Sequence, residues 1–124
     1  MRIYFYICES NKLKFYRHET QQSKNLEMEV FNIEKLDECV QKHSSSKKAL
    51  NKFIEILDNA DIGNHSELLK IFPKADYVGN NRYVFDIKGN NFRVVCVVVF
   101  VAGTVFVRFA GTHAEYDKIN AATI

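Results

Sequence analysis

The sequence predicts a single α+β domain in which a helical hairpin packs against an antiparallel sheet of three to four strands. The chain has 124 residues, which is enough for one hydrophobic core and too few for two ordinary domains. Apolar residues recur at helical spacing in the first half, and the period changes to two after Pro73, the only proline. Glycine-containing turns separate the apolar runs of the second half. The expected order is therefore a short strand, helices, an antiparallel meander and a short C-terminal helix.

Residues 1–27 are predicted to lie outside this domain, which occupies residues 28–124. They alternate poorly and contain the polar stretch RHETQQSKNLE shortly before a second methionine, Met28. One interpretation is an N-terminal extension weakly tied to the domain, or an initiation codon assigned too far upstream. The other is that the segment RIYFYI adds an edge strand. Both interpretations stay open on the sequence alone.

The helical hairpin follows a short strand predicted at EVFN. The apolar residues of IEKLDECVQKHS stand at helical spacing, and they are Ile33, Leu36, Cys39 and Val40. The next helix, KKALNKFIEILDNA, has one apolar stripe formed by Leu50, Phe53, Ile54 and Leu57. Ser44, Ser45 and Ser46 precede this helix and are predicted to offer its N-cap. A third helical piece, SELLKIF, ends before Pro73, because proline disfavours helix in the preceding residue.

The second half is predicted to form strands joined by tight turns at GNN, GNN and AG. Opposite residues of an antiparallel pair share one face of a sheet. A two-residue turn within the second GNN therefore places Asp86 opposite Arg93. A two-residue turn at AG places Val97 opposite Arg108.

This register divides the sheet into two unlike faces. The apolar face, on which the helical hairpin is expected to pack, collects Phe85, Ile87, Phe92, Val94, Cys96, Val98, Phe100, Val105, Val107 and Phe109. The other face carries Asp86, Lys88, Arg93 and Arg108, with Thr112 opposite Arg93, next to Val95, Val97, Val99 and Phe106. A charged face is ordinarily the solvated side of a half-buried sheet. Here three cations from three strands lie together at one end of a sheet face whose other residues are mostly apolar. This arrangement favours an anion-binding site.

The residues THAEYD follow the last strand, next to these cations. A helical turn places His113 and Tyr116, three residues apart, on one side. Cleavage of an RNA phosphodiester needs a base for the 2′-hydroxyl proton, cations for the phosphate and an acid for the leaving oxygen. A histidine is suited to this task because an imidazole ordinarily gains and loses its proton near neutral pH, and Glu115 can share the work if its pKa is raised. The alternative is that His113 caps or packs and that Tyr116 is a packing aromatic; His18, His43 and His65 are assigned no role.

Composition and spacing exclude several classes of protein. Three cysteines without CxxC spacing, Cys8, Cys39 and Cys96, indicate reduced thiols in a cytoplasmic protein. No His, Cys, Asp or Glu residues stand at the spacing of metal ligands, and no glycine-rich phosphate loop is present. We therefore expect neither a metal nor a cofactor. The longest apolar run, Val94 to Gly103, is shorter than the ~20 residues of a membrane span, and no export signal is visible.

Net charge gives little affinity for a polyanion. Five of the 17 Lys and Arg residues and three of the 15 Asp and Glu residues lie within residues 1–27. The rest of the chain therefore carries twelve of each sign. Any binding of nucleic acid must come from local clusters of cations.

The segment VGNNRYVFDIKGNNFRVVCVVVF, together with VFVRFAGTHAEYDKI, resembles the HigB-type toxins of bacterial type II toxin–antitoxin systems, in the RelE/ParE superfamily. The resemblance starts at Met28, where EVFNIEKLDECVQKH is similar to the first strand and helix of that family. It implies a RelE/ParE-like fold and a metal-independent endoribonuclease, an mRNA interferase acting on messages bound to the ribosome. The implied partner is an antitoxin of the HigA type with a helix-turn-helix, through which alone the toxin reaches operator DNA.

The resemblance also implies roles for individual residues. Lys88, Arg93 and Arg108 match by position the basic residues that RelE-like nucleases use on the scissile phosphate, and Arg82 joins Lys88 and Arg93 as an RNA-binding residue. The catalytic acid and base of the superfamily lie near the positions of His113, Glu115 and Tyr116.

Two other functions remain open. ParE-like relatives share the fold and bind DNA gyrase without cutting RNA, so the fold alone does not decide the activity. A decayed toxin that acts only as an antitoxin-binding module is the third hypothesis, motivated by the unusual first 27 residues.

Overall fold

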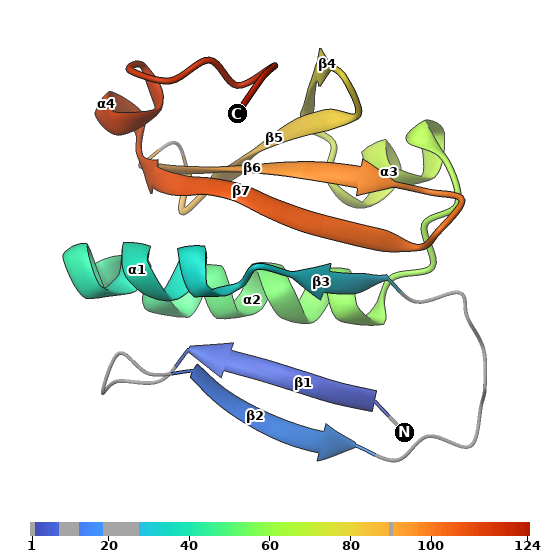
Figure 1. The fold of residues 1–124 in the computed structure, drawn as a ribbon, viewed down its shortest axis with the longest axis horizontal. Helices are drawn as coiled ribbons and strands as arrows, with labels where there is room; N and C mark the ends of the chain where they lie inside the picture. Colours follow the sequence, from blue (N-terminus) through green and yellow to red (C-terminus); the bar gives the residue numbers. More distant parts are fainter. Residues whose placement is uncertain (1, 8–12, 19–27, 90) are drawn as a thin grey trace.

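The computed structural model describes residues 2–7, 13–18, 28–89 and 91–124, the first two ranges by their backbone alone. A five-stranded sheet and the helices that cover one of its faces make up the main body (Figure 1). None of the helices in these ranges has the length and apolar character needed to cross a membrane. The predicted α+β fold with a helical hairpin on a sheet is confirmed.

The sheet has the strand order β3-β7-β6-β5-β4. Its strands are β3 (Glu29–Phe31), β4 (Asp76–Gly79), β5 (Arg82–Ile87), β6 (Phe92–Val99) and β7 (Thr104–Thr112). The four later strands are antiparallel to their neighbours, whereas β3 pairs in parallel with β7. The short strand expected at EVFN thus joins the meander as an edge strand, which makes the sheet mixed and one strand larger than predicted.

Helices form where the apolar spacing predicts them. They are α1 (Glu34–Lys42), the 3₁₀ helix η1 (Ser44–Ser46), α2 (Lys47–Asn59), α3 (His65–Ile71) and α4 (His113–Tyr116). The predicted N-cap of α2 is confirmed in position, at Ser46, but not as a side-chain hydrogen bond. The Ser46 side chain does not cap α2, since its hydroxyl donates a 2.7 Å hydrogen bond to the main-chain oxygen of His43.

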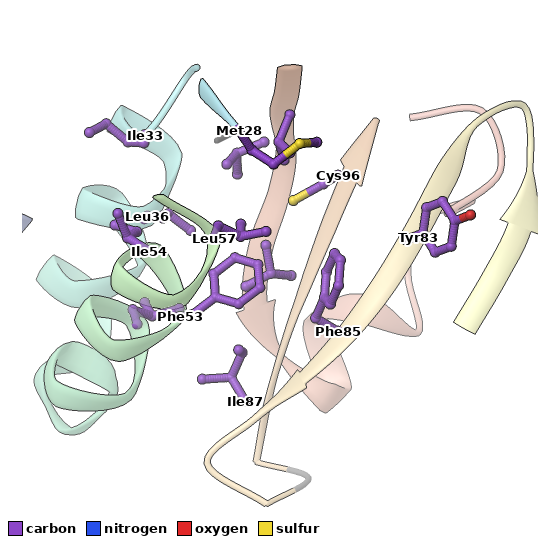
Figure 2. Packing of buried hydrophobic residues seen from close by; sticks show 14 of the residues in the cluster. Met28, Ile33, Leu36, Phe53, Ile54, Leu57, Tyr83, Phe85, Ile87 and Cys96 are labelled. Atoms are coloured by element: carbon purple, nitrogen blue, oxygen red, sulfur yellow. The ribbon is translucent and has the colours of Figure 1, made fainter. Parts of the chain in front are cut away.

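The core lies between α1, α2 and one face of the sheet. All the residues predicted on the apolar face, except Phe109, belong to this core or pack against it. Figure 2 shows Phe53 of α2 pointing toward Phe85 of β5, and their ring centroids lie 5.0 Å apart. Phe72 contacts Phe85 at the same centroid distance of 5.0 Å. We call the opposite face of the sheet, which is turned away from α1 and α2, the outer face.

Two of the three cysteines lie in this core. Cys39 and Cys96 are buried free thiols, and burial raises the pKa of both. The prediction of reduced thiols is therefore confirmed for these two residues, whereas Cys8 lies outside the described residues.

The N-terminal segment forms a separate hairpin. β1 (Arg2–Ile7) pairs antiparallel with β2 (Leu13–His18) in a two-stranded sheet of their own. The pair lies on the far side of α1 and α2 from the five-stranded sheet (Figure 1). The segment RIYFYI is thus a strand, as one interpretation held, but its partner is β2 and not the edge of the main sheet.

The β5–β6 hairpin confirms the predicted pairing of Asp86 with Arg93. Its connection is longer than two residues, because the last pair of the ladder joins Ile87 to Phe92. Lys88 consequently lies in the turn, with a left-handed φ of 55°. It does not continue the strand that carries Asp86.

The β6–β7 hairpin differs from the predicted register. Val99 pairs with Thr104, so the connection is longer than the two residues expected, and Val97 pairs with Phe106 instead of Arg108. Further along, Val95 pairs with Phe109 while the next residue, Cys96, pairs with Val107. Arg108 is the extra residue of a β-bulge. This bulge moves Phe109 to the outer face, and together with the longer connection it places Gly111, not Thr112, opposite Arg93.

Replacing Phe85 with alanine is expected to lower the free energy of unfolding by about 3–5 kcal/mol, because it opens a cavity in the core. Urea denaturation followed by circular dichroism measures the change. The control is Val101→Ala, at a side chain that is 97% exposed, for which we expect a change within about 0.5 kcal/mol. A loss for Phe85→Ala no larger than that of the control would contradict the packing described.

Candidate active site

Three arginines, one from each of the neighbouring strands β5, β6 and β7, lie on the outer face. Period-two alternation places Arg82, Arg93 and Arg108 there, and the β-bulge adds Phe109 beside Arg108. Lys88 does not join them as predicted, because its ammonium donates a 3.4 Å hydrogen bond to the main-chain oxygen of Ser45, in η1. The predicted convergence of Lys88, Arg93 and Arg108 is therefore wrong for Lys88.

Arg93 is held between an acidic and an aromatic side chain. Its Nε lies 3.3 Å from Asp86 Oδ1, across the β5–β6 pair. Its guanidinium carbon lies 4.8 Å from the centroid of the Tyr116 ring, within the range of a cation–π interaction. The Tyr116 ring in turn contacts Phe109, with centroids 6.3 Å apart. The structure thus brings together Arg93 and Tyr116, two of the residues that the sequence proposed for catalysis.

Tyr116 reaches this position because α4 starts directly at the end of β7 (Figure 1). The Thr112 hydroxyl accepts a 3.1 Å hydrogen bond from the Glu115 N–H, and Glu115 Oε1 accepts one of 2.9 Å from the Thr112 N–H. This reciprocal capping box fixes the first turn of α4. A Cβ atom at Gly111 would lie 2.5 Å from Glu115 Oε1 and 2.9 Å from Phe109 Cζ, so a larger residue there would displace the Glu115 carboxylate or the Phe109 ring.

His113 is the first residue of α4, and its side chain is exposed to solvent. Its N–H donates a 3.3 Å hydrogen bond to the main-chain oxygen of Asn91, which ties α4 to the β5–β6 turn. The side chain is 49% exposed, and Nε2 lies 3.8 Å from Asp117 Oδ2. His113 is thus neither a buried core histidine nor the N-cap, which is Thr112. Its imidazole is accessible to a ligand.

Glu115 does not meet the condition set for it as a base. Its pKa is lowered, first by the hydrogen bond from the Thr112 main chain and then by the nearby His43, against the opposing effect of burial. A carboxylate with a lowered pKa is a poor proton acceptor near neutral pH. The geometry gives Glu115 a structural task, which is to hold the start of α4.

His43 is a site residue that the sequence analysis missed. It lies between α1 and η1, and its Nε2 is 3.4 Å from Glu115 Oε1. Its ring also packs on Phe92, with centroids 5.7 Å apart. His43 therefore connects the helical hairpin to α4, far away in the sequence. No local pattern marks this role, because it depends on a contact between distant segments.

The C-terminal residues after α4 lie on the outer face, opposite the helical layer (Figure 1). Arg82 Nε donates a 2.8 Å hydrogen bond to the main-chain oxygen of Ile124, and Arg108 Nε donates one of 3.3 Å to the same oxygen. Asn80 Nδ2 donates a 2.8 Å hydrogen bond to the main-chain oxygen of Ala122. The chain therefore folds back over the sheet and ends at two of the three arginines. From the sequence we predict only a polar helical turn in this region.

The remaining histidines do not join the site. His65 Nδ1 lies 2.7 Å from the Tyr83 hydroxyl, in the aromatic packing between α3 and β5. His18 belongs to β2, which is described by its backbone alone. In the parts of the chain that the structure describes, no three His, Cys, Asp or Glu side chains are grouped so that they could hold a metal ion.

Known proteins resemble the chain over this region. A family model described as HigB_toxin, the RelE-like toxic component of a toxin-antitoxin system, matches residues 46–119. The mRNA interferase HigB of Escherichia coli O6:H1 (strain CFT073) is 32% identical over 94 residues, which cover 74% of this chain and 91% of that protein. The mRNA interferase toxin HigB of Escherichia coli K12 is 28% identical over 97 residues, covering 76% of this chain and 92% of that protein. The family match includes every predicted site residue and leaves out His43.

Glu115→Gln is expected to destabilise the protein at neutral pH by about 1 kcal/mol, the usual size of a capping interaction. Because the pKa of Glu115 is lower in the folded state, its contribution is present above the unfolded value of ~4.3 and disappears as the pH falls through the folded value. Thermal unfolding between pH 3 and 7 measures this effect. We expect the variant to lose less stability on acidification than the parent.

The matched control is Asp117→Asn, which removes the same charge from an exposed side chain next to α4. It should leave the stability at neutral pH almost unchanged. Equal acid sensitivity of Glu115→Gln and the parent would show that the capping contact is absent in solution.

Proposed function

The chain belongs to the HigB family of RelE-like toxins, and from this premise we propose that it is an mRNA endoribonuclease that cuts messages during their translation on the ribosome. As a member of this family it has a cognate antitoxin as its partner and mRNA as its substrate. The single observation that carries the role of the site is the contact between Arg93 and Tyr116 on the outer face. It places a fixed cation beside a side chain that can carry a proton.

The proposed reaction is attack by the 2′-hydroxyl of the RNA on the neighbouring phosphorus. A base removes the proton from the 2′-oxygen, which bonds to phosphorus as the bond to the 5′-oxygen breaks, and an acid protonates the departing 5′-oxygen. Arg93 stabilises the negative charge that grows on the phosphate oxygens, since a guanidinium matches phosphate geometry. We assign the proton transfers to His113 and Tyr116, with Arg108 as a further cation on the same face.

The assignment to His113 follows from its exposure and from the ordinary pKa range of histidine. An imidazole titrates close to neutral pH, so it can both accept and donate a proton under cellular conditions. His113 stands at the start of the helix that carries Tyr116, beside the turn that precedes β6. Glu115 and His43 act in this proposal as positioning residues, because they hold α4 in place without contacting the substrate.

The identity of the partner and the compartment are also part of the proposal. We infer that the antitoxin is of the HigA type with a helix-turn-helix, and that operator DNA is reached only through it. Translating ribosomes place the activity in the cytoplasm. Lys88, at the end of the sheet beside η1, is proposed to contact RNA away from the scissile phosphate.

We further propose that residues 28–124 form the toxin domain and that residues 1–27 are an appendage to it. The hairpin β1–β2 supports this division, because it pairs only with itself and leaves the five-stranded sheet complete. The family match also lies entirely within the proposed domain.

Arg93→Ala and His113→Ala are each expected to relieve the growth arrest caused by the unaccompanied toxin, by removing the phosphate-binding cation and a proton carrier. For His113→Ala, loss of acid–base catalysis predicts a cleavage rate about 10²–10⁴ times lower. Arg93→Lys should retain part of the activity, since it keeps the charge and loses the planar fork. Growth after induction and cleavage of a translated reporter message measure both effects.

The control for these variants is Lys118→Ala, which removes an exposed cation just beyond α4 and should leave toxicity unchanged. Circular dichroism verifies that each variant is folded. If Arg93→Ala and His113→Ala are folded and fully toxic, the proposed site is incorrect.

A further inference from the structure

A row of unlike side chains crosses four strands of the outer face. Arg82 of β5 pairs with Val97 of β6, Val97 pairs with Phe106 of β7, and Phe106 pairs with Phe31 of β3. Paired residues share one face, so the row runs from a cation over an apolar residue to two aromatic rings. Neighbouring strands lie about 4.8 Å apart, which places Phe106 about 10 Å from Arg82 in strand spacing.

The cationic end of the row is already arranged around one oxygen atom. Arg82 and Arg108 both donate to the main-chain oxygen of Ile124, at 2.8 and 3.3 Å. Arg108 lies on β7 two residues after Phe106, so alternation along the strand puts both side chains on the outer face. Two guanidinium groups that converge on a single oxygen have the geometry that binds one phosphate oxygen. Neither group is used by the Arg93–Tyr116 contact.

The aromatic end of the row is unusually exposed. Phe31 is 42% exposed and stacks on Phe106, with ring centroids 5.2 Å apart and an angle of 21° between the rings. Because β3 is an edge strand, the Phe31 ring adds exposed apolar surface next to Phe106 on the outer face. Exposed aromatic rings beside arginines are the combination that binds single-stranded nucleic acid, because bases stack on the rings and phosphates pair with the cations.

We propose that this row is a nucleotide-binding subsite for single-stranded RNA, which adjoins the scissile phosphate at Arg93 and shares Arg108 with it. The phosphate of the nucleotide lies between Arg82 and Arg108, in the place now taken by the Ile124 oxygen, and its base stacks on the exposed Phe31 ring, which Phe106 supports. The C-terminal residues move aside when RNA enters. The subsite rests on the proposed function, since it holds the same RNA strand at a second nucleotide and thereby fixes the register of cleavage.

Binding of a short RNA that cannot be cleaved tests this subsite. The probe is a fluorescein-labelled hexanucleotide with 2′-O-methyl groups, whose blocked 2′-oxygens prevent the attack, and its anisotropy is followed with the full chain. Phe31→Ala and Arg82→Ala are each expected to weaken binding roughly tenfold. Val101→Ala, which removes an exposed apolar side chain outside the row, is expected to bind as the parent does.

The two variants should differ in their response to salt. Arg82→Ala removes one phosphate contact, so the slope of log K against log salt is expected to become shallower by about 0.7. Phe31→Ala removes a stacking contact and should leave the slope unchanged. This difference separates a nucleotide site from a general loss of structure, which would alter both variants alike.

Three outcomes would overturn the subsite. These are no binding of the probe by the parent, equal binding by parent and both variants, and normal RNA binding by Phe31→Ala together with loss of neutralisation by the antitoxin. The last outcome would assign the aromatic pair to the antitoxin interface.

The failure of the subsite can be told apart from the failure of the proposed function. If the parent cuts translated mRNA but the row variants, Phe31→Ala and Arg82→Ala, bind the probe normally, only the subsite fails. If the row variants lose binding while the parent cuts no mRNA, the subsite stands and the proposed function fails.

Discussion

The β-bulge at Arg108 is the constraint on which the arrangement of the outer face depends. It inserts one residue between the Val95–Phe109 and Cys96–Val107 pairs of the central hairpin. On one side of it Val107 faces the helices, and on the other side Phe109 faces away from them, so β7 can complete the core and still present an aromatic ring to Tyr116. The shifted register also determines where β7 ends and α4 begins, and thereby brings Tyr116 over Arg93.

The periodic parts of this architecture are predictable from the sequence, and the irregular parts are not. The stripes of α1 and α2 and the apolar face of the sheet follow from spacing alone, because burial repeats every 3.6 or two residues. The bulge has no such pattern, and the AG turn suggested a two-residue connection where the ladder resumes only at the Val99–Thr104 pair. The unrecognised extra residue changed the face on which Phe109 lies, and together with the longer connection it changed the partner of Arg93. The contact of His43 with Glu115 and the return of the chain to Arg82 join segments distant in sequence, so no local signal announces them.

The candidate site concentrates charge without making the domain basic. Beyond residue 27 the chain carries as many acidic as basic residues, yet three arginines share the outer face. Each of them has a partner within the protein: Asp86 and Tyr116 for Arg93, and the Ile124 oxygen for Arg82 and Arg108. These partners hold the guanidinium groups in place before RNA arrives, which lowers the entropy lost on binding. Affinity for RNA therefore comes from local geometry, and it should depend steeply on salt.

The most direct test of the account is to map new 5′ ends on a reporter mRNA after induction of the toxin without its antitoxin. Two versions of the message are compared side by side, one that is translated and one whose start codon has been removed. We predict new ends inside the translated message and none in the untranslated one. Growth arrest without new ends in either message would contradict it and would indicate a target other than mRNA, such as the DNA gyrase bound by ParE-like relatives.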